Sequence, residues 1–169
     1  MPVASAGLAT DPQRIPRRLE SALRREGLKV KQERARGHVA LTVWTGALGA
    51  PLDQQPADPL QGLGRGLARD LALPKAVSFR PEVRERLDRH DREQVVLTLT
   101  RQVLDEVPQP RLWLTRSGSP DPCPEDLSWF AAADETWRSL GLAPDYAVVT
   151  REGWCLLPSG LLRRWRRLR

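Results

Sequence analysis

Two short stretches of the chain share a pattern of residues that could bind an anion. The sequence is Thr-Arg-Ser-Gly at 115–118 and Thr-Arg-Glu-Gly at 150–153. A guanidinium group donates paired hydrogen bonds that suit a phosphate or a carboxylate, and a threonine hydroxyl can add another. The alternative is that threonine ends a strand, arginine is abundant and glycine makes the turn. The candidate anion-binding residues are Thr115, Arg116, Thr150 and Arg151.

The elements on either side of these stretches are expected to bring them together. Alternating apolar residues predict strands over Arg111–Thr115 and Tyr146–Thr150, and an amphipathic pattern predicts a helix over Glu125–Leu140. A strand, helix and strand of this length is typical of a βαβ unit with parallel strands. The carboxyl ends of parallel strands lie at one edge of the sheet. We therefore expect Arg116 and Arg151 to lie close enough to share an anion.

Positive charge is concentrated near the two ends of the chain. Residues 14–36 hold nine basic and three acidic residues, and residues 163–169 hold five arginines and no acid. The stretch between them has 13 basic and 17 acidic residues. A GC-rich genome can explain why 24 of 27 basic residues are arginine, but it does not explain their positions. Such segments are typical of a protein that binds an acidic partner, although a solvated surface is the alternative. The candidate residues for binding nucleic acid or an acidic partner are Arg14, Arg17, Arg18, Arg24, Arg25, Arg163, Arg164, Trp165, Arg166, Arg167 and Arg169.

The last nine residues combine arginine with tryptophan and leucine. As a helix, the segment Leu161–Arg169 would place its leucines and Trp165 on one face and its arginines on the other. This pattern has three interpretations. The segment could bind nucleic-acid phosphates with Trp165 stacked on a base, lie on an anionic membrane surface, or dock on the body of the protein.

The first half of the chain gives weaker patterns. We predict a helix over Asp11–Gly27, with the glycine as its stop, and a β-hairpin over Leu28–Thr45. A second helix is predicted over Pro59–Leu73. The Gly-rich run inside it, at 62–66, follows no strand and lacks the lysine of a phosphate-binding loop, so a helix start or close helix packing is the better interpretation.

The middle and the end of the chain complete the expected fold. A short strand is predicted over Ala76–Phe79, a short helix over Pro81–His90 and a returning strand over Trp154–Leu157. The segment Asp91–Val107 fits either a strand or a helix, and the longer apolar spacing favours a helix with Asp91 as its cap. The fold class is therefore α/β or α+β. It has a small mixed sheet with a C-terminal βαβ-hairpin unit, an N-terminal helix and hairpin, and surrounding helices.

Catalytic and metal-binding patterns are absent from the sequence. The cysteines (Cys123, Cys155) and histidines (His38, His90) lack the spacing of a metal site, and no nucleophile or metalloprotease motif occurs. We predict no metal, no cofactor and no catalytic residue, and we favour a protein that is not an enzyme.

Length and composition suggest a leader over residues 1–10, one globular domain over 11–160 and a basic segment over 161–169. An organellar transit peptide is the alternative for the leader. Few cysteines and no long apolar run indicate a cytoplasmic protein without a transmembrane segment. The favoured function is non-catalytic nucleic-acid binding or nucleoprotein assembly through the arginine-rich ends. The alternatives are an assembly factor or regulator that docks on an acidic protein or a membrane surface, and an enzyme acting on a small anion. The sequence leaves the oligomeric state open.

Overall fold

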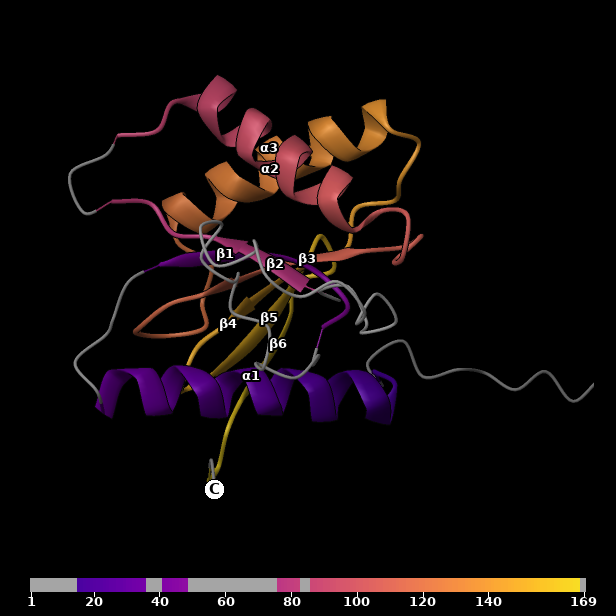
Figure 1. The fold of residues 1–169 in the computed structure, drawn as a ribbon. Coiled ribbons are helices and arrows are strands. Elements are labelled where there is room, and N and C mark those ends of the chain that lie inside the picture. Colours follow the sequence, from indigo (N-terminus) through magenta and orange to yellow (C-terminus); the bar gives the residue numbers. More distant parts are fainter. Residues whose placement is uncertain (1–14, 36–40, 49–75, 83–85, 168–169) are drawn as a thin grey trace, which may run out of the picture.

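The computed structural model describes residues 15–35, 41–48, 76–82 and 86–167. Within these ranges the elements form three layers, with α1 on one side of a sheet and α2 and α3 on the other (Figure 1). The helices are α1 (Arg17–Ala35), α2 (Arg89–Val103) and α3 (Pro124–Ser139). The strands are β1 (Thr42–Gly46), β2 (Ala76–Phe79), β3 (Arg111–Thr115), β4 (Tyr146–Val149), β5 (Gly153–Leu157) and β6 (Leu161–Arg164). This mixed sheet with helices on both faces fits the α/β or α+β class that the sequence predicts.

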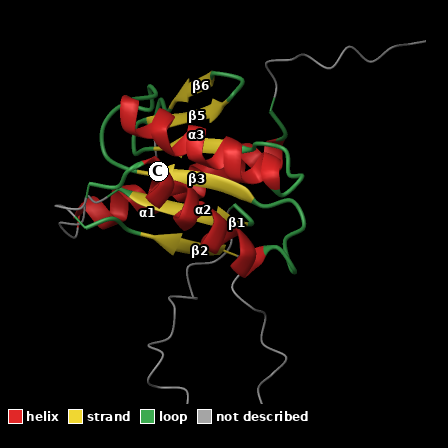
Figure 2. Cartoon of the chain, turned by 90° about the horizontal axis from the view of Figure 1, so that it is seen from above, coloured by secondary structure: helices red, strands yellow, loops and turns green. Residues whose placement is uncertain are grey.

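The strands of the described sheet follow the order β2-β1-β3-β4-β5-β6, from one edge to the other (Figure 2). Strands β3 and β4 are parallel, with Leu112 opposite Tyr146, and α3 connects them. The other neighbouring strands are antiparallel. The C-terminal βαβ unit and the hairpin that follows it are therefore confirmed.

Successive side chains of the central strands point to opposite faces of the sheet, and a hydrophobic core lies on each face. On β3, Leu112 and Leu114 pack beneath α2 and α3, whereas Trp113 packs beneath α1. Strand β4 alternates in the same way. The indole of Trp137 on α3 donates a buried hydrogen bond of 2.9 Å to the hydroxyl of Thr100 on α2, which ties these two helices together.

Helix α1 differs from the prediction at both ends, because it begins at Arg17, after the non-helical Ile15 and Pro16, and continues through Gly27 to Ala35. The apolar stripe of the helix extends from Leu23 to Val30, and both residues are buried. The predicted hairpin over Leu28–Thr45 is wrong in its first half, since that half belongs to the helix. Gly27 does not end the helix. Its missing side chain instead allows Trp165 to pack closely against the helix backbone.

Two further boundaries differ from the predictions. Pro81, Glu82 and 86–88 are not helical, so the short helix predicted over Pro81–His90 is wrong for these residues, and its last two residues belong to α2. Helix α2 confirms the helical interpretation of Asp91–Val107, but its N-cap is Asp88. The backbone N–H of Asp91 donates to the Asp88 carboxylate at 2.8 Å, and the Asp88 N–H donates back at 2.9 Å. The helix predicted over Pro59–Leu73 lies outside the described residues.

Candidate functional site

The two arginine-rich segments lie side by side on one face of the molecule. Helix α1 and the chain that follows β6 cross each other in Figure 1, and three contacts join them. Arg163 forms an ion pair with Glu20, and Nη2 of Arg24 donates to the backbone oxygen of Arg167 at 3.4 Å. The indole of Trp165 packs against Gly27. Segments almost 150 residues apart in sequence therefore present their charges together.

The end of the chain reaches α1 because it forms a strand and not the predicted helix. Strand β6 pairs with β5 along its length, and the backbone N–H of Trp165 continues this pairing with a 2.9 Å bond to Glu152 O. Alternation along the strand directs Leu161 and Trp165 toward the core beneath α1. The described apolar residues of this segment, Leu161, Leu162 and Trp165, thus dock on the body of the protein, and its described arginines remain exposed.

The most exposed residues of α1, among those whose side chains the structure describes, include no acidic residue. Its exposed residues, which we name the outer row, are Arg17, Arg18, Ser21, Arg24, Arg25, Lys31 and Gln32. The three acidic residues of the helix lie elsewhere, and each has a cationic partner. Glu20 pairs with Arg163, the buried Glu26 accepts from Lys29 Nζ at 2.7 Å, and Glu33 lies 4.0 Å from Arg80. The outer row is therefore wholly basic or neutral.

A hollow of about 470 Å³ lies beside the outer row, where the end of the chain meets the turn between β4 and β5. Its lining contains five cationic side chains, one acidic side chain and an indole: Lys31, Arg151, Arg164, Arg166, Arg167, Glu152 and Trp165. We call the outer row together with Arg151, Arg166 and Arg167 the basic face. Arg164 is not part of it, because alternation along β6 directs Arg164, like Leu162, toward the side of α2 and α3. Arg151 pairs with Glu152 at 3.4 Å, and Arg164 pairs with Asp121.

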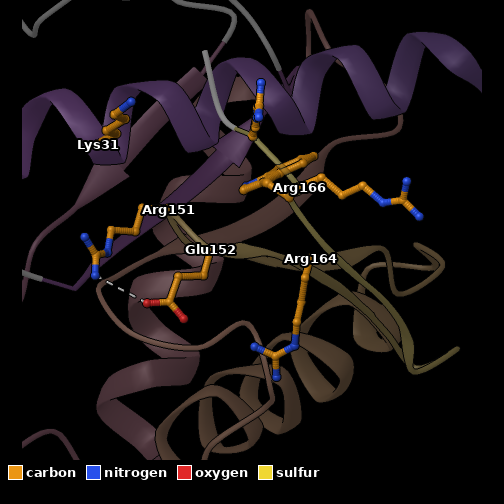
Figure 3. Close-up of a pocket in the computed structure, with 7 residues that line it drawn as sticks. Lys31, Arg151, Glu152, Arg164 and Arg166 are labelled. Atoms are coloured by element: carbon orange, nitrogen blue, oxygen red, sulfur yellow. Dashed lines mark hydrogen bonds and ion pairs between the residues drawn. The ribbon is translucent and has the colours of Figure 1, made fainter.

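The cations of the hollow spread outward from it. In Figure 3 the guanidinium groups of Arg151, Arg164 and Arg166 point in different directions around the hollow, and Lys31 reaches it from α1. Cations that converge would suit one small anion. Cations arranged in this way suit an extended anion that contacts several of them in turn.

The predicted site at the ends of β3 and β4 has the expected backbone geometry but a different use of its side chains. The strands are parallel, and the Arg116 N–H donates to Val149 O at 3.3 Å, so both arginines follow the same edge. Both threonines are buried. The Thr115 hydroxyl accepts from the indole of Trp44 at 3.0 Å, and that of Thr150 accepts from Glu152 N at 3.1 Å.

The guanidinium of Arg116 is fully engaged within the protein. Two of its N–H groups donate to the carboxylate of Asp126, at 2.9 and 2.6 Å, and Asp126 is completely buried. The other three donate to the backbone oxygens of Ser117, Ser119 and Asp121. An arginine has five N–H donors, so this side chain keeps none for a bound anion. The hydrogen bonds to Asp126 are also the main reason why the pKa of Arg116 is raised above its ordinary value.

The basic face contains residues that sequence reasoning missed. Lys31 and Glu152 line the hollow, but Lys31 was expected on a strand and Glu152 only in a turn. The helical spacing of Leu23, Glu26 and Val30 was the signal that could have placed Lys31 on α1. Of the predicted nucleic-acid-binding residues, Arg14 and Arg169 lie outside the described residues. Trp165 lines the hollow, Arg163 pairs with Glu20 and Arg164 pairs with Asp121. The others belong to the basic face: Arg17, Arg18, Arg24, Arg25, Arg166 and Arg167.

No group of three or more potential metal ligands occurs in the described ranges. None of the helices in that part of the chain is long and apolar enough to cross a membrane. No protein-family model, no curated protein and no solved structure matches this chain.

Proposed function

We propose that this protein binds nucleic acid through its basic face and does so without catalysing a reaction. The observation that carries the proposal is the meeting of the two arginine-rich segments. Arg163 pairs with Glu20, and the indole of Trp165 packs on Gly27. A surface that gathers many guanidinium groups attracts the phosphates of a polyanion, whose bound counterions are released on association.

The distribution of charge across the sheet supports a binding face with a defined orientation. Helix α1 carries seven basic and three acidic residues. Helices α2 and α3, on the opposite side of the sheet, carry four arginines and six acidic residues between them. A polyanion is therefore attracted to the α1 side and weakly repelled from the other, which orients the encounter.

The other candidate functions have less structural support. A membrane-bound terminal helix would need its apolar face for lipid, but Leu161 and Trp165 already pack on the sheet. A small-anion site at the edge of β3 and β4 would need Arg116, whose donors are occupied. An acidic protein partner would use the same basic face, and recovery of a stoichiometric protein partner after nuclease treatment would favour it.

The proposal is tested by fluorescence anisotropy with labelled single-stranded DNA, duplex DNA and RNA over a range of salt concentrations. We expect the logarithm of the association constant to fall linearly with the logarithm of the salt concentration. The paired variants R24Q/R25Q and R166Q/R167Q remove charge from different segments of the same face. Each should reduce the salt slope by about two.

The matched control is R101Q/R138Q, which removes two exposed arginines from α2 and α3. This variant has the same change in net charge but on the opposite side of the sheet, so its salt slope should stay close to that of the wild type. Absence of binding to all three nucleic acids at low salt would overturn the proposal. Equal losses in the control and in the α1 variant would show that net charge, and not the basic face, is responsible.

A further inference from the structure

The outer row of α1 has a regular spacing along the helix. Arg17, Arg24 and Lys31 follow one another at intervals of seven residues, which is about two turns, and Arg18 and Arg25 stand beside the first two. At about 1.5 Å per residue, the row from Arg17 to Lys31 is about 21 Å long. All five side chains are exposed among the described residues, on the side of the sheet opposite α2 and α3, and the end of the chain crosses the helix next to Arg24 (Figure 1).

The row can act as a continuous line of positive charge because the acids of α1 are neutralised elsewhere. Glu26 is buried against the sheet and bonds to Lys29, and Glu20 is held by Arg163 on β6. The row therefore has a net positive charge. The pair of Glu20 and Arg163 joins α1 to β6, whereas Glu26 and Lys29 belong to the same helix.

The aromatic residues near the basic face do not favour the binding of a single strand. Proteins that bind single-stranded nucleic acid usually stack its bases on exposed aromatic rings. The phenylalanine, tyrosine and tryptophan side chains in the described ranges are all buried or half-buried. Trp165, the aromatic residue in the hollow, is half-buried, and its indole N–H faces Thr150 O at 3.4 Å. Contacts with phosphates are thus the main interaction that this face offers.

We propose that the basic face docks on double-stranded DNA, with α1 lying along the major groove and its arginines on the phosphates that border it. A helix about 10–12 Å in diameter matches the roughly 12 Å width of this groove in B-form DNA. The major groove of duplex RNA is too narrow for a helix. A duplex carries one charge per about 1.7 Å of axis, counting both strands, so a length of about 21 Å carries about twelve phosphate charges, of which the row can contact those that border the groove. This inference rests on the proposed function and adds the class of nucleic acid.

The cations of the hollow extend this contact beyond the groove. Arg166 and Arg167 lie beside α1, and the backbone oxygen of Arg167 accepts from Arg24. They are positioned to reach the DNA backbone next to the segment that α1 occupies. The row consists mostly of arginines that are placed to contact phosphates, and phosphate contacts carry no information about the bases. Binding should therefore depend little on the DNA sequence.

The test compares one sequence as duplex DNA, single-stranded DNA and duplex RNA, at the same salt concentration and with the intact chain. Duplex DNA should bind at least about tenfold more tightly than the other two. The variant R17Q/R24Q should lower the affinity for duplex DNA at least about tenfold, and R101Q/R138Q should change it less than about twofold. The melting temperatures of both variants should stay within a few degrees of the wild type, because exposed substitutions rarely change stability.

Each result has a distinct meaning. Equal or tighter binding of single-stranded DNA or duplex RNA would overturn the duplex-DNA inference and leave the proposed function standing. An unchanged affinity of R17Q/R24Q for duplex DNA would also overturn it, since α1 would then not form the contact. Failure to bind any of the three nucleic acids would remove the proposed function as well.

Discussion

The indole of Trp165 lies against the backbone of α1 at Gly27, so closely that a Cβ atom at this position would stand 3.2 Å from the indole Nε1 and 3.3 Å from Thr150 O. The contact joins the end of the chain to the middle of the first described helix. Glycine usually destabilises a helix interior by about 1 kcal/mol relative to alanine. Its presence here is explained by the space that Trp165 occupies.

Replacement of Gly27 by valine should separate these two segments. The branched side chain would overlap the indole and a backbone oxygen, and such overpacking typically costs about 1–3 kcal/mol. Urea unfolding should show this loss. The control is S21V, at an exposed position on the same helix, which introduces the same side chain without the overlap. Equal stability of the two variants would show that Gly27 is not a packing requirement.

The pair of Arg116 and Asp126 should be important for stability and not for binding. Replacement of Asp126 by asparagine leaves the guanidinium without its anionic partner, and loss of one member of a buried pair typically costs about 3–5 kcal/mol. Because the Arg116 side chain is 14% exposed, we expect a value near the lower end of this range. Thermal or urea unfolding would measure it.

The comparison for this prediction is the exposed pair of Arg151 and Glu152, whose side chains are 42% and 41% exposed. The E152Q variant should change the stability by no more than about 0.5 kcal/mol. If D126N were as stable as E152Q, the interpretation of Arg116 as a structural residue would be wrong.

The sequence predicted the C-terminal half of the fold because its signals are local there. The strand Arg111–Thr115 was predicted with the boundaries that the structure shows, and α3 begins one residue before its predicted start and ends one before its predicted end. Alternating apolar residues, flanking turns and a helix of ordinary length agree in this region. Parallel pairing then followed from the length of the connection.

The errors occur where two patterns fit the same residues. Leu28 and Val30 alternate with lysines as in a strand, and the helical stripe is hidden because Glu26 is charged although it is buried. The last segment fits either a helix or a strand, and pairing with β5 decides between them. The role of Arg116 depends on Asp126, ten residues away, and no local pattern shows that this carboxylate turns inward.

The buried Glu26 should make stability depend on pH. Burial is the main cause that raises the pKa of Glu26 above its ordinary value of 4.5, and the hydrogen bond and charge of Lys29 act in the opposite direction. Between the ordinary and the raised pKa the folded protein binds more protons than the unfolded chain. The contribution of Glu26 to stability therefore falls as the pH rises through this window, which begins near 4.5.

The E26Q variant isolates this effect from the other titrating groups, since glutamine stays neutral. The free energy of unfolding of the variant minus that of the wild type should increase from about pH 4 upward and become constant above the folded pKa. Urea unfolding at a series of pH values would measure the difference. A difference that is constant or falls with pH would contradict the raised pKa.

Removal of the negative charge of Glu20 should strengthen binding, which is a gain that misfolding cannot produce. Glu20 has a side chain that is 38% exposed and holds Arg163 in an ion pair at the border of the basic face. The E20Q variant leaves Arg163 available for a phosphate, so about one more counterion should be released on binding. At about 0.1 M salt this corresponds to an affinity about three- to tenfold higher and a salt slope steeper by about one.

The control E135Q removes an exposed acid from α3, on the opposite side of the sheet, and should change the affinity less than about twofold. Anisotropy titrations with duplex DNA would measure both variants. If E20Q bound no more tightly than E135Q, phosphates would not approach the surface where the last strand meets α1, and the proposed binding face would have to lie elsewhere.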